Sequence, residues 1–376
     1  MTTWFTPEGT DLDEFRAVCE QKTEAADYPH ALDVAGNVLI YPGDLPNTRE
    51  IQSELIRALR DGPGVVVFAG AFEASVVDRA TEVFARLIGE QRASGRTGGD
   101  HFAKPGANDR VWGALDKFAL RDPEAFAAYY DNDTLALVCQ AWLGTGYQVT
   151  SQVNVVNPGG VAQVAHRDYH LGFMSREQAL RYPAHIHALS PMLTLQGAVA
   201  HVDMPVETGP TLYLPHSQKY PAGYLAFHDP SFTAYFDAHH VQLPLAKGDA
   251  AFFNPAVFHG AGTNNSAAVR RMANLLQVSS AFGRAMETVD RAAMTLALYP
   301  VLLSWAGSVD NVIAASAEGY AFPTDLDADQ PVGGLAPPTQ ADLVRRALAG
   351  RWDETRLRQS VRSASTGESR AARVAG

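Results

Sequence analysis

The segment Gln163-Val164-Ala165-His166-Arg167-Asp168-Tyr169-His170 follows a Gly159-Gly160 turn and contains a His-x-Asp pair. If this segment is extended, its side chains alternate between two faces, so His166 and Asp168 lie together and Arg167 lies opposite. Two imidazoles and one carboxylate on a single face form the ligand set of non-haem iron sites that keep positions open for other ligands. The segment therefore supplies two candidate ligands for such a metal.

A second pair with the same spacing, His201-Val202-Asp203, competes for this assignment. The chain has 12 histidines, and roughly one such pair is expected by chance in a chain of this composition. The second pair leads into Glu207-Thr208-Gly209-Pro210, a turn at which side chains finish a strand and face solvent. We therefore assign the metal to the first pair.

The third candidate ligand is His259, which follows the apolar stretch 250–253. Arg270 begins a later β-rich stretch, in which Met272, Asn274, Leu276 and Val278 would share its face. An arginine inside a barrel needs an anionic partner, and a carboxylate accepts its two-pronged guanidinium. Two interpretations stay open: an inward Arg270 that binds a carboxylate, or a surface Arg270 beside Arg271.

The central part of the chain is rich in β-forming residues. From about Tyr147, short runs of such residues are broken by Pro, Gly and Asn, which favours an antiparallel sandwich or a double-sheet jelly roll. Strands are expected at residues 148–156, 161–168, 192–202, 211–214, 241–245, 250–253 and 270–278. The predicted fold class is thus mainly β with flanking helices, around a double-stranded β-helix (jelly roll, cupin-like) core.

Helical patterns surround this core. Residues 48–61 and 74–88 have helical spacing with the strand-like run 65–68 between them, and Ser175 with Gln178 forms a capping signature. We expect a single catalytic domain over residues 1–376. In it, a mostly helical region 1–146 packs on the core 147–282, which carries a helical insertion near 175–190. Helices follow over 283–359, and a tail without fixed structure covers 360–376.

Composition narrows the class of partner. The net charge of -11 and the pI near 5.5 argue against a basic surface for nucleic acid or anionic lipid. Two cysteines predict no disulfide framework, and the longest apolar stretch, 292–307, is shorter than the roughly 20 residues of a bilayer span. We expect a cytoplasmic enzyme with a small-molecule substrate, no nucleic-acid or membrane partner, and a composition compatible with a homo-oligomer.

Three segments resemble the phytanoyl-CoA dioxygenase family, a branch of the iron(II)/2-oxoglutarate-dependent oxygenases built on a double-stranded β-helix. They are 163–170, 207–217 (Glu-Thr-Gly-Pro-Thr-Leu-Tyr-Leu-Pro-His-Ser), and the stretch from Gly248-Asp249 through His259, Asn264 and Ser266 to Arg270. The resemblance covers about residues 64–280, so both termini lie outside it.

This resemblance implies roles for particular residues. His166, Asp168 and His259 would bind Fe(II) at the catalytic centre, Arg270 would anchor 2-oxoglutarate, and Gln163 would lie near this co-substrate. The implied reaction uses O2, converts 2-oxoglutarate to succinate and CO2, and hydroxylates a small organic substrate. Asp168 favours hydroxylation, because related halogenases lack this carboxylate and use the open position for halide.

The chain departs from the family pattern where a Ser or Thr commonly follows the distal histidine by two residues. Here that residue is Ala261, and Thr263 is a candidate replacement for the hydroxyl. Two alternatives to the family reaction are a jelly-roll binding module without catalysis and a cupin-type iron oxygenase that uses no 2-oxoglutarate. The complete triad argues against the first, and loss of 2-oxoglutarate affinity in Arg270→Ala would argue against the second. The primary substrate is left open.

Overall fold

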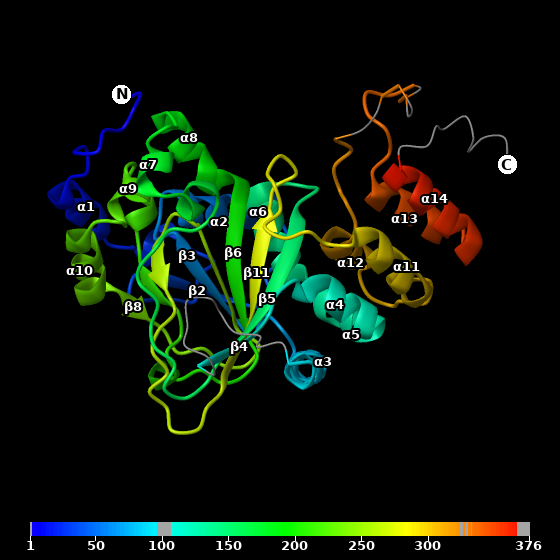
Figure 1. The fold of residues 1–376 in the computed structure, drawn as a ribbon, viewed down its shortest axis with the longest axis horizontal. Coiled ribbons are helices and arrows are strands. Elements are labelled where there is room, and N and C mark those ends of the chain that lie inside the picture. Colours follow the sequence, from blue (N-terminus) through cyan, green and yellow to red (C-terminus); the bar gives the residue numbers. More distant parts are fainter. Residues whose placement is uncertain (1, 96–106, 324–325, 328–329, 332, 367–376) are drawn as a thin grey trace.

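The computed structural model describes residues 2–95, 107–323, 326–327, 330–331 and 333–366. Its centre is an eight-stranded mixed sheet (Figure 1). In spatial order the strands are β1 (Asp33–Ala35), β2 (Val38–Pro42), β3 (Val65–Ala69), β9 (Ala250–Phe253), β6 (Thr194–Ala200), β11 (Arg271–Ser279), β5 (Gln148–Val156) and β4 (Asn108–Val111). Only the β2–β3 pair is parallel among these neighbours.

A smaller sheet of three antiparallel strands accompanies the main sheet. Its order is β10 (Phe258–Gly260), β7 (Leu212–Leu214) and β8 (Val241–Gln242). An apolar cluster joins the two sheets, with Val65, Val67 and Phe253 from the main sheet and Tyr213 from β7. The strands that precede His166 and those that follow it are therefore held in one layered core.

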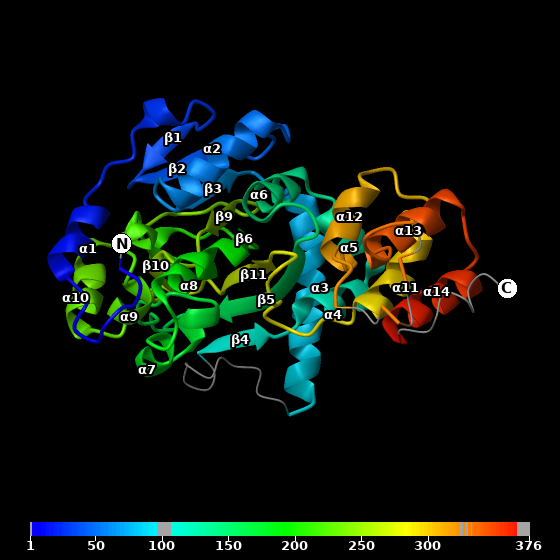
Figure 2. The ribbon, with the colours of Figure 1, turned by 90° about the horizontal axis from the view of Figure 1, so that it is seen from above.

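Helices make up much of the remaining structure. Before β5 lie α1 (Leu12–Cys19), α2 (Arg49–Arg60), α3 (Ala74–Ala93), α4 (Ala114–Arg121), α5 (Pro123–Tyr130) and α6 (Asp133–Leu143). Between the later strands lie α7 (Arg176–Ala179), α8 (Ala184–Leu189), α9 (Gly223–Ala226) and α10 (Pro230–His239). After β11 come α11 (Arg291–Leu302), α12 (Val309–Ser316), α13 (Gln340–Ala349) and α14 (Glu354–Thr366), which lie together at the end away from the N-terminus (Figures 1 and 2).

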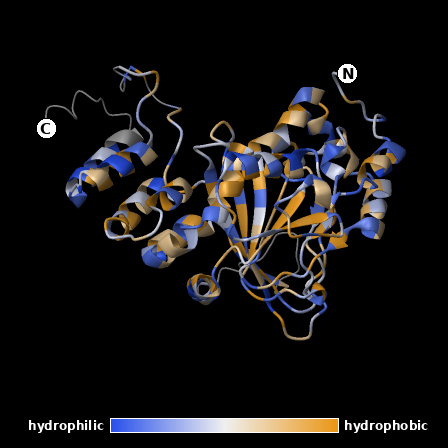
Figure 3. Ribbon diagram, turned by 180° about the vertical axis from the view of Figure 1, so that it is seen from behind, coloured by the Kyte–Doolittle hydropathy of each residue, from blue (hydrophilic) through white to orange (hydrophobic). Residues whose placement is uncertain are grey.

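The two faces of the main sheet have different surroundings. On one face, Val149, Val153, Leu276 and Val278 pack with α2 to α6 in the largest apolar cluster. Figure 3 shows the strands of this sheet as largely hydrophobic. The opposite face carries the alternate residues of the same strands, and it is the face that the candidate site uses.

The predicted fold class is wrong in its balance, because about 43% of the structure is helical and 17% is strand. The sheet prediction over 148–156 and 250–253 matches β5 and β9. Residues 161–168 form no strand and make only an isolated bridge between His166 and His259. Four strands, β1 to β4, lie in the region 1–146 that was expected to be mostly helical, and they join the main sheet.

The ends of the predicted regions can also be placed. The helices α7 and α8 lie where the insertion near 175–190 was expected, and α14 extends to Thr366, past the predicted tail boundary at 360. Residues 367–376 of that predicted tail lie outside the described part of the chain. None of the helices that the structure describes is long and apolar enough to span a membrane.

Candidate metal centre

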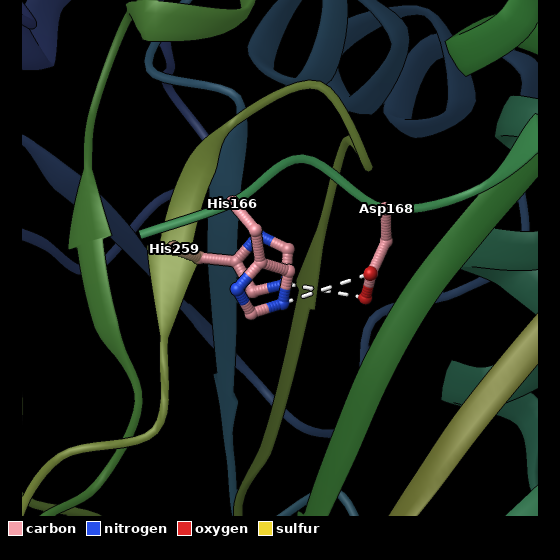
Figure 4. Close-up of side chains that lie close together, drawn as sticks. All are labelled: His166, Asp168 and His259. Atoms are coloured by element: carbon pink, nitrogen blue, oxygen red, sulfur yellow. Dashed lines mark ion pairs between the residues drawn. The ribbon is translucent and has the colours of Figure 1, made fainter. Parts of the chain in front are cut away.

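The structure brings His166, Asp168 and His259 together (Figure 4). One potential ligand atom from each side chain lies within 4.8 Å of the others, and no other such group occurs among the described residues. His259 lies on β10, and His166 lies beside it because their backbones exchange two hydrogen bonds, of 3.0 Å and 3.1 Å. The Asp168 N–H donates to the Pro255 carbonyl at 3.1 Å, which fixes the third member.

Both imidazoles are oriented by their own backbone. The Nδ1 atom of His166 lies 2.9 Å from the Val164 carbonyl, and Nδ1 of His259 lies 2.9 Å from the Val257 carbonyl. Because a carbonyl oxygen can only accept, each Nδ1 carries the proton and each Nε2 keeps its lone pair. These Nε2 atoms face Asp168, at 3.6 Å from Oδ1 and 3.4 Å from Oδ2 (Figure 4). The three donors therefore converge as a two-histidine, one-carboxylate metal site requires.

Asp168 is held from the main sheet by Gln196 of β6, whose Nε2 donates to Oδ2 at 2.5 Å. Burial alone would raise the pKa of Asp168, but His166, His259 and this amide outweigh burial and keep the pKa well below its usual range. The carboxylate is therefore ionised and ready to bind a cation. Sequence reasoning missed Gln196, since a lone glutamine in an apolar strand has no motif to mark it.

Arg167, between the two ligands in sequence, points the other way and anchors the segment. Its guanidinium is buried, and Nη2 donates to the Ser217 and Tyr220 carbonyls at 2.6 Å and 3.1 Å. Its Cζ lies 5.1 Å and 5.2 Å from the ring centres of Tyr224 and Phe258. Burial lowers the pKa of Arg167 to about 10. The alternation predicted from the sequence is thus present, although the segment is not a strand.

The Arg167→Lys variant is expected to fold but to bind Fe(II) about 10–100-fold more weakly, as when an outer partner of a metal ligand is lost. A lysine keeps the charge, yet it cannot stack a planar group on the two rings while donating to the two carbonyls. Competition with a metal indicator measures the affinity, and circular dichroism checks the fold. Unchanged affinity would show that Arg167 does not position His166 and Asp168.

The structure does not bring Arg270 to the triad. Its side chain is 53% exposed, and its guanidinium donates to Asp109 at 2.9 Å and Asn157 at 3.1 Å. Asp109 also pairs with Arg92 of α3, so this contact lies on the helix-covered side of the sheet. Of the two orientations left open by the sequence, the structure has the surface one, since the face that Arg270 shares with Met272 and Leu276 is the face packed against helices.

Arg271 occupies the opposite face. It is 6% exposed, burial lowers its pKa to about 10, and Nη1 donates to the Gly262 carbonyl at 3.3 Å. On β11, Arg271 lies on the same face as Ala273, Leu275 and Gln277. Gln277 lies opposite Gln196 of β6, whose side chain donates a hydrogen bond to Asp168. No carboxylate of the described residues forms a salt bridge with Arg271. A buried cation on the triad's side of the sheet thus calls for an anion other than the carboxylates of the described residues.

Two further predicted positions lie beside His259. The Gln163 Oε1 atom accepts from the Ala261 N–H at 3.3 Å, and the Gln163 N–H donates to the Ala261 carbonyl at 2.8 Å. The Thr263 hydroxyl accepts from the Ala162 N–H at 2.9 Å. Both side chains therefore brace the loop that carries His166 against the segment after His259.

His201, the rival histidine, lies on the helix side of the sheet and is 1% exposed. Its Nδ1 lies 2.8 Å from the Thr81 hydroxyl, and that hydroxyl itself donates to the Val77 carbonyl, so Nδ1 must donate. Its Nε2 lies 3.0 Å from the Tyr129 hydroxyl. Burial lowers the pKa of His201 to about 3. Both ring nitrogens are used inside the core, so the expectation that the side chains of this pair face solvent is wrong for His201.

A pH dependence of stability follows from His201. Its pKa is near 6.5 when unfolded and about 3 when folded, so the unfolded state binds the extra proton as pH falls below about 6.5. The free energy of unfolding should therefore fall, by about 2 kcal/mol between pH 7 and pH 5 from this group. Urea unfolding of the wild type and of His201→Gln at both pH values measures it. Equal losses in the two proteins would contradict this assignment.

A candidate metal site of two histidines and one carboxylate, beside a large and a small β-sheet, fits the class of mononuclear non-haem metalloenzymes of the cupin type. The profile of the phytanoyl-CoA dioxygenase (PhyH) family matches residues 54–272. This match spans more than half of the chain, so the chain belongs to the phytanoyl-CoA dioxygenase family. It is a non-haem iron, 2-oxoglutarate-dependent oxygenase.

Several solved structures are similar in fold. AviO1 from Streptomyces viridochromogenes Tue57 is 16% identical, with 64% of this chain and 99% of AviO1 covered and a TM-score of 0.46. The epimerase SnoN, in complex with Fe3+, alpha ketoglutarate and nogalamycin RO, is 17% identical, with 74% and 98% covered and a TM-score of 0.43. HygX from Streptomyces hygroscopicus, with nickel and 2-oxoglutarate bound, is 16% identical, with 65% and 91% covered and a TM-score of 0.41. Comparison with curated proteins finds no match.

Proposed function

We propose that the protein hydroxylates a small organic substrate with Fe(II) bound by His166, Asp168 and His259. In the balanced reaction, a substrate C–H bond, O2 and 2-oxoglutarate give an alcohol, succinate and CO2, with one oxygen atom in the alcohol and one in succinate. When bound, the iron supplies the oxygen activation that side chains cannot. The chain's own residues hold the metal, bind the co-substrate and position the substrate.

The burial of Arg271 is the observation that supports this proposal most strongly. Arg271 has a buried guanidinium without a carboxylate partner among the described residues, on the same face of the sheet as Gln196 and Asp168. The distal carboxylate of 2-oxoglutarate would accept its two parallel N–H groups and neutralise the buried charge. We therefore propose Arg271 as the anchor in place of Arg270, with Gln163 on the adjoining loop close to the same carboxylate.

The two alternative functions are less favoured. A binding module without catalysis has no use for a carboxylate whose pKa is lowered and which faces the Nε2 atoms of two imidazoles. A cupin-type oxygenase that uses no oxo-acid leaves the buried Arg271 without an anion. Asp168 also fills the position that a halide would need, which favours hydroxylation over halogenation.

Two measurements test the proposal. Anaerobic addition of Fe(II) and then 2-oxoglutarate should produce a visible charge-transfer absorption band, because the keto acid chelates the metal. In air, the complex should release succinate, slowly without substrate and faster when a substrate is present. Failure to form the band with wild-type protein would overturn the proposal.

A further inference from the structure

The triad-side face of the main sheet is polar where its other face is apolar. We call Thr150, Gln152, Asn154, Gln196 and Gln277 the polar wall. The strand register places Gln196, Gln277 and Thr150 in one row across β6, β11 and β5, with Gln152 and Asn154 further along β5 on the same face. Gln196 connects this wall to Asp168 through its amide. The polar wall therefore adjoins the proposed metal.

The middle of this face is accessible to solvent. Ala273 and Leu275, in the centre of β11, are partly exposed, as is Asn154 beside them on β5. On the opposite face of the same strand, Asn274 and Leu276 are fully buried. This nine-residue central strand is therefore buried on one face and partly accessible on the face toward the triad.

Several polar atoms on this side have no hydrogen-bond partner. They are Gln196 Oε1, Gln277 Oε1, Asn154 Oδ1 and Glu287 Oε2. The orientation of Gln196 is fixed, because its Nε2 donates to Asp168, so its free atom is an acceptor. Unsatisfied polar atoms in such places are costly and call for an explanation, such as a bound ligand.

Glu287 decides which kind of ligand would satisfy these atoms. Its Oε1 accepts from the Gly113 N–H at 2.8 Å and from Gln152 Nε2 at 3.3 Å, which leaves Oε2 available. Gln152 in turn accepts from Arg110, and the Arg110 guanidinium lies 4.3 Å from the centre of the Trp112 ring. Glu287 follows β11 and lies outside the family match at 54–272, so it is a feature of this chain rather than of the matched region.

Tyr169 completes the site from the ligand segment. It is 2% exposed and adopts a φ of 66°, a conformation that is unfavourable for a bulky residue. It directly follows Asp168, and its electrostatic neighbours include Asp168 and Glu287. Backbone strain of this kind persists where the surroundings over-determine it, often at ligand sites. Here it accompanies a buried phenol that lies within electrostatic reach of both Asp168 and Glu287.

The geometry points to a substrate rich in hydrogen-bond donors, an amino-substituted or polyhydroxylated molecule whose ammonium or hydroxyl groups meet Glu287, Tyr169 and the polar wall. This inference rests on the proposed hydroxylase function and specifies its substrate class. An acyl chain would leave the same acceptors buried and unpaired. Arg110 and Trp112 border the same site, because Arg110 donates to Gln152 and lies against the Trp112 ring.

The test compares two sets of probes on the Fe(II) and 2-oxoglutarate complex of the full chain. One set is D-glucosamine, D-galactosamine, kanamycin and myo-inositol, and the other is decanoic acid and hexanoyl-coenzyme A. At least one donor-rich probe should raise succinate release above the substrate-free rate. The amino compounds and myo-inositol separate an ammonium from a hydroxyl requirement. The inference would be overturned if no donor-rich probe raised succinate release, or if only the acyl probes did.

Variants make the assignment specific. Glu287→Gln should raise the KM for the active probe by about tenfold or more, since a hydrogen bond to a charged group is lost. The charge-transfer band with 2-oxoglutarate should stay intact. Glu82→Gln, on the exposed side of α3, is the matched control. Tyr169→Phe should also raise the KM for the active probe. If Glu287→Gln does not fold, this second variant tests the proposed substrate site. An unchanged KM in folded variants contradicts the substrate site, whereas loss of the band in wild-type protein contradicts the hydroxylase function itself.

Discussion

The His259→Ala variant is expected to lose iron binding and turnover together. His259 is 5% exposed, and its ring is fixed by the Val257 carbonyl so that Nε2 faces Asp168. Without it, one imidazole and one carboxylate remain, too few for a stable site of this type. The affinity should fall by more than the roughly 100-fold typical of a lost outer partner. Metal-indicator competition and succinate release measure the two effects.

His201→Gln is the matched control for this experiment. It also removes a buried histidine from the chain, but one whose ring nitrogens both face protein groups on the far side of the sheet. It should lower stability and keep the metal affinity of the wild type. If His259→Ala bound Fe(II) as tightly as the wild type, or if His201→Gln lost the metal, the assignment of the triad would be wrong.

The second large effect is expected from Arg271→Ala. Removing a buried cation that binds a carboxylate costs about 2–5 kcal/mol, so the KM for 2-oxoglutarate should rise at least about 30-fold. Iron affinity should change little, because within the described residues this guanidinium donates to the Gly262 carbonyl and makes no hydrogen bond to a triad atom. Steady-state kinetics with varied 2-oxoglutarate, together with titration of the charge-transfer band, separate the two affinities.

Arg270→Ala is the control one residue away. Its ion pair with Asp109 is exposed on the Arg270 side and is worth about 0–1 kcal/mol. We expect a near-normal KM for 2-oxoglutarate in this variant. If the KM for 2-oxoglutarate rose strongly in Arg270→Ala and did not change in Arg271→Ala, Arg270 would be the anchor, as the family resemblance implies.

These two neighbouring arginines show what a sequence can and cannot specify. The alternation of side chains along β11 was predicted from the sequence, and the structure has it. The sequence did not predict which face of β11 is directed toward the candidate metal site, because that depends on which elements pack against each face of the strand. Met272 and Leu276 pack against the helices, while the polar Gln277 and Arg271 lie on the face toward the candidate metal site. Only the placement of α2 to α6 resolves the choice.

The candidate triad was predicted more completely, because its ligand types and spacing carry chemical meaning in themselves. Gln196 and Glu287 lack such spacing, and their roles depend on contacts across strands and on the chain that follows β11. The strands β1 and β2 were missed for a similar reason, since residues 1–45 have no firm period, and it is the pairing of β1 with β2 and of β2 with β3 that makes them strands. Tertiary contacts, rather than local pattern, determine these parts.

The paired backbone hydrogen bonds between His166 and His259 have a consequence for how the metal arrives. They fix the separation of the two imidazoles through main-chain geometry, and the Val164 and Val257 carbonyls fix the ring rotations. The two imidazoles therefore lose little conformational entropy when a metal ion binds. Metal binding should then be a single step to a preformed site. Stopped-flow traces with Co(II) as a coloured surrogate should show one phase whose rate is proportional to metal concentration, with no slow folding step behind it.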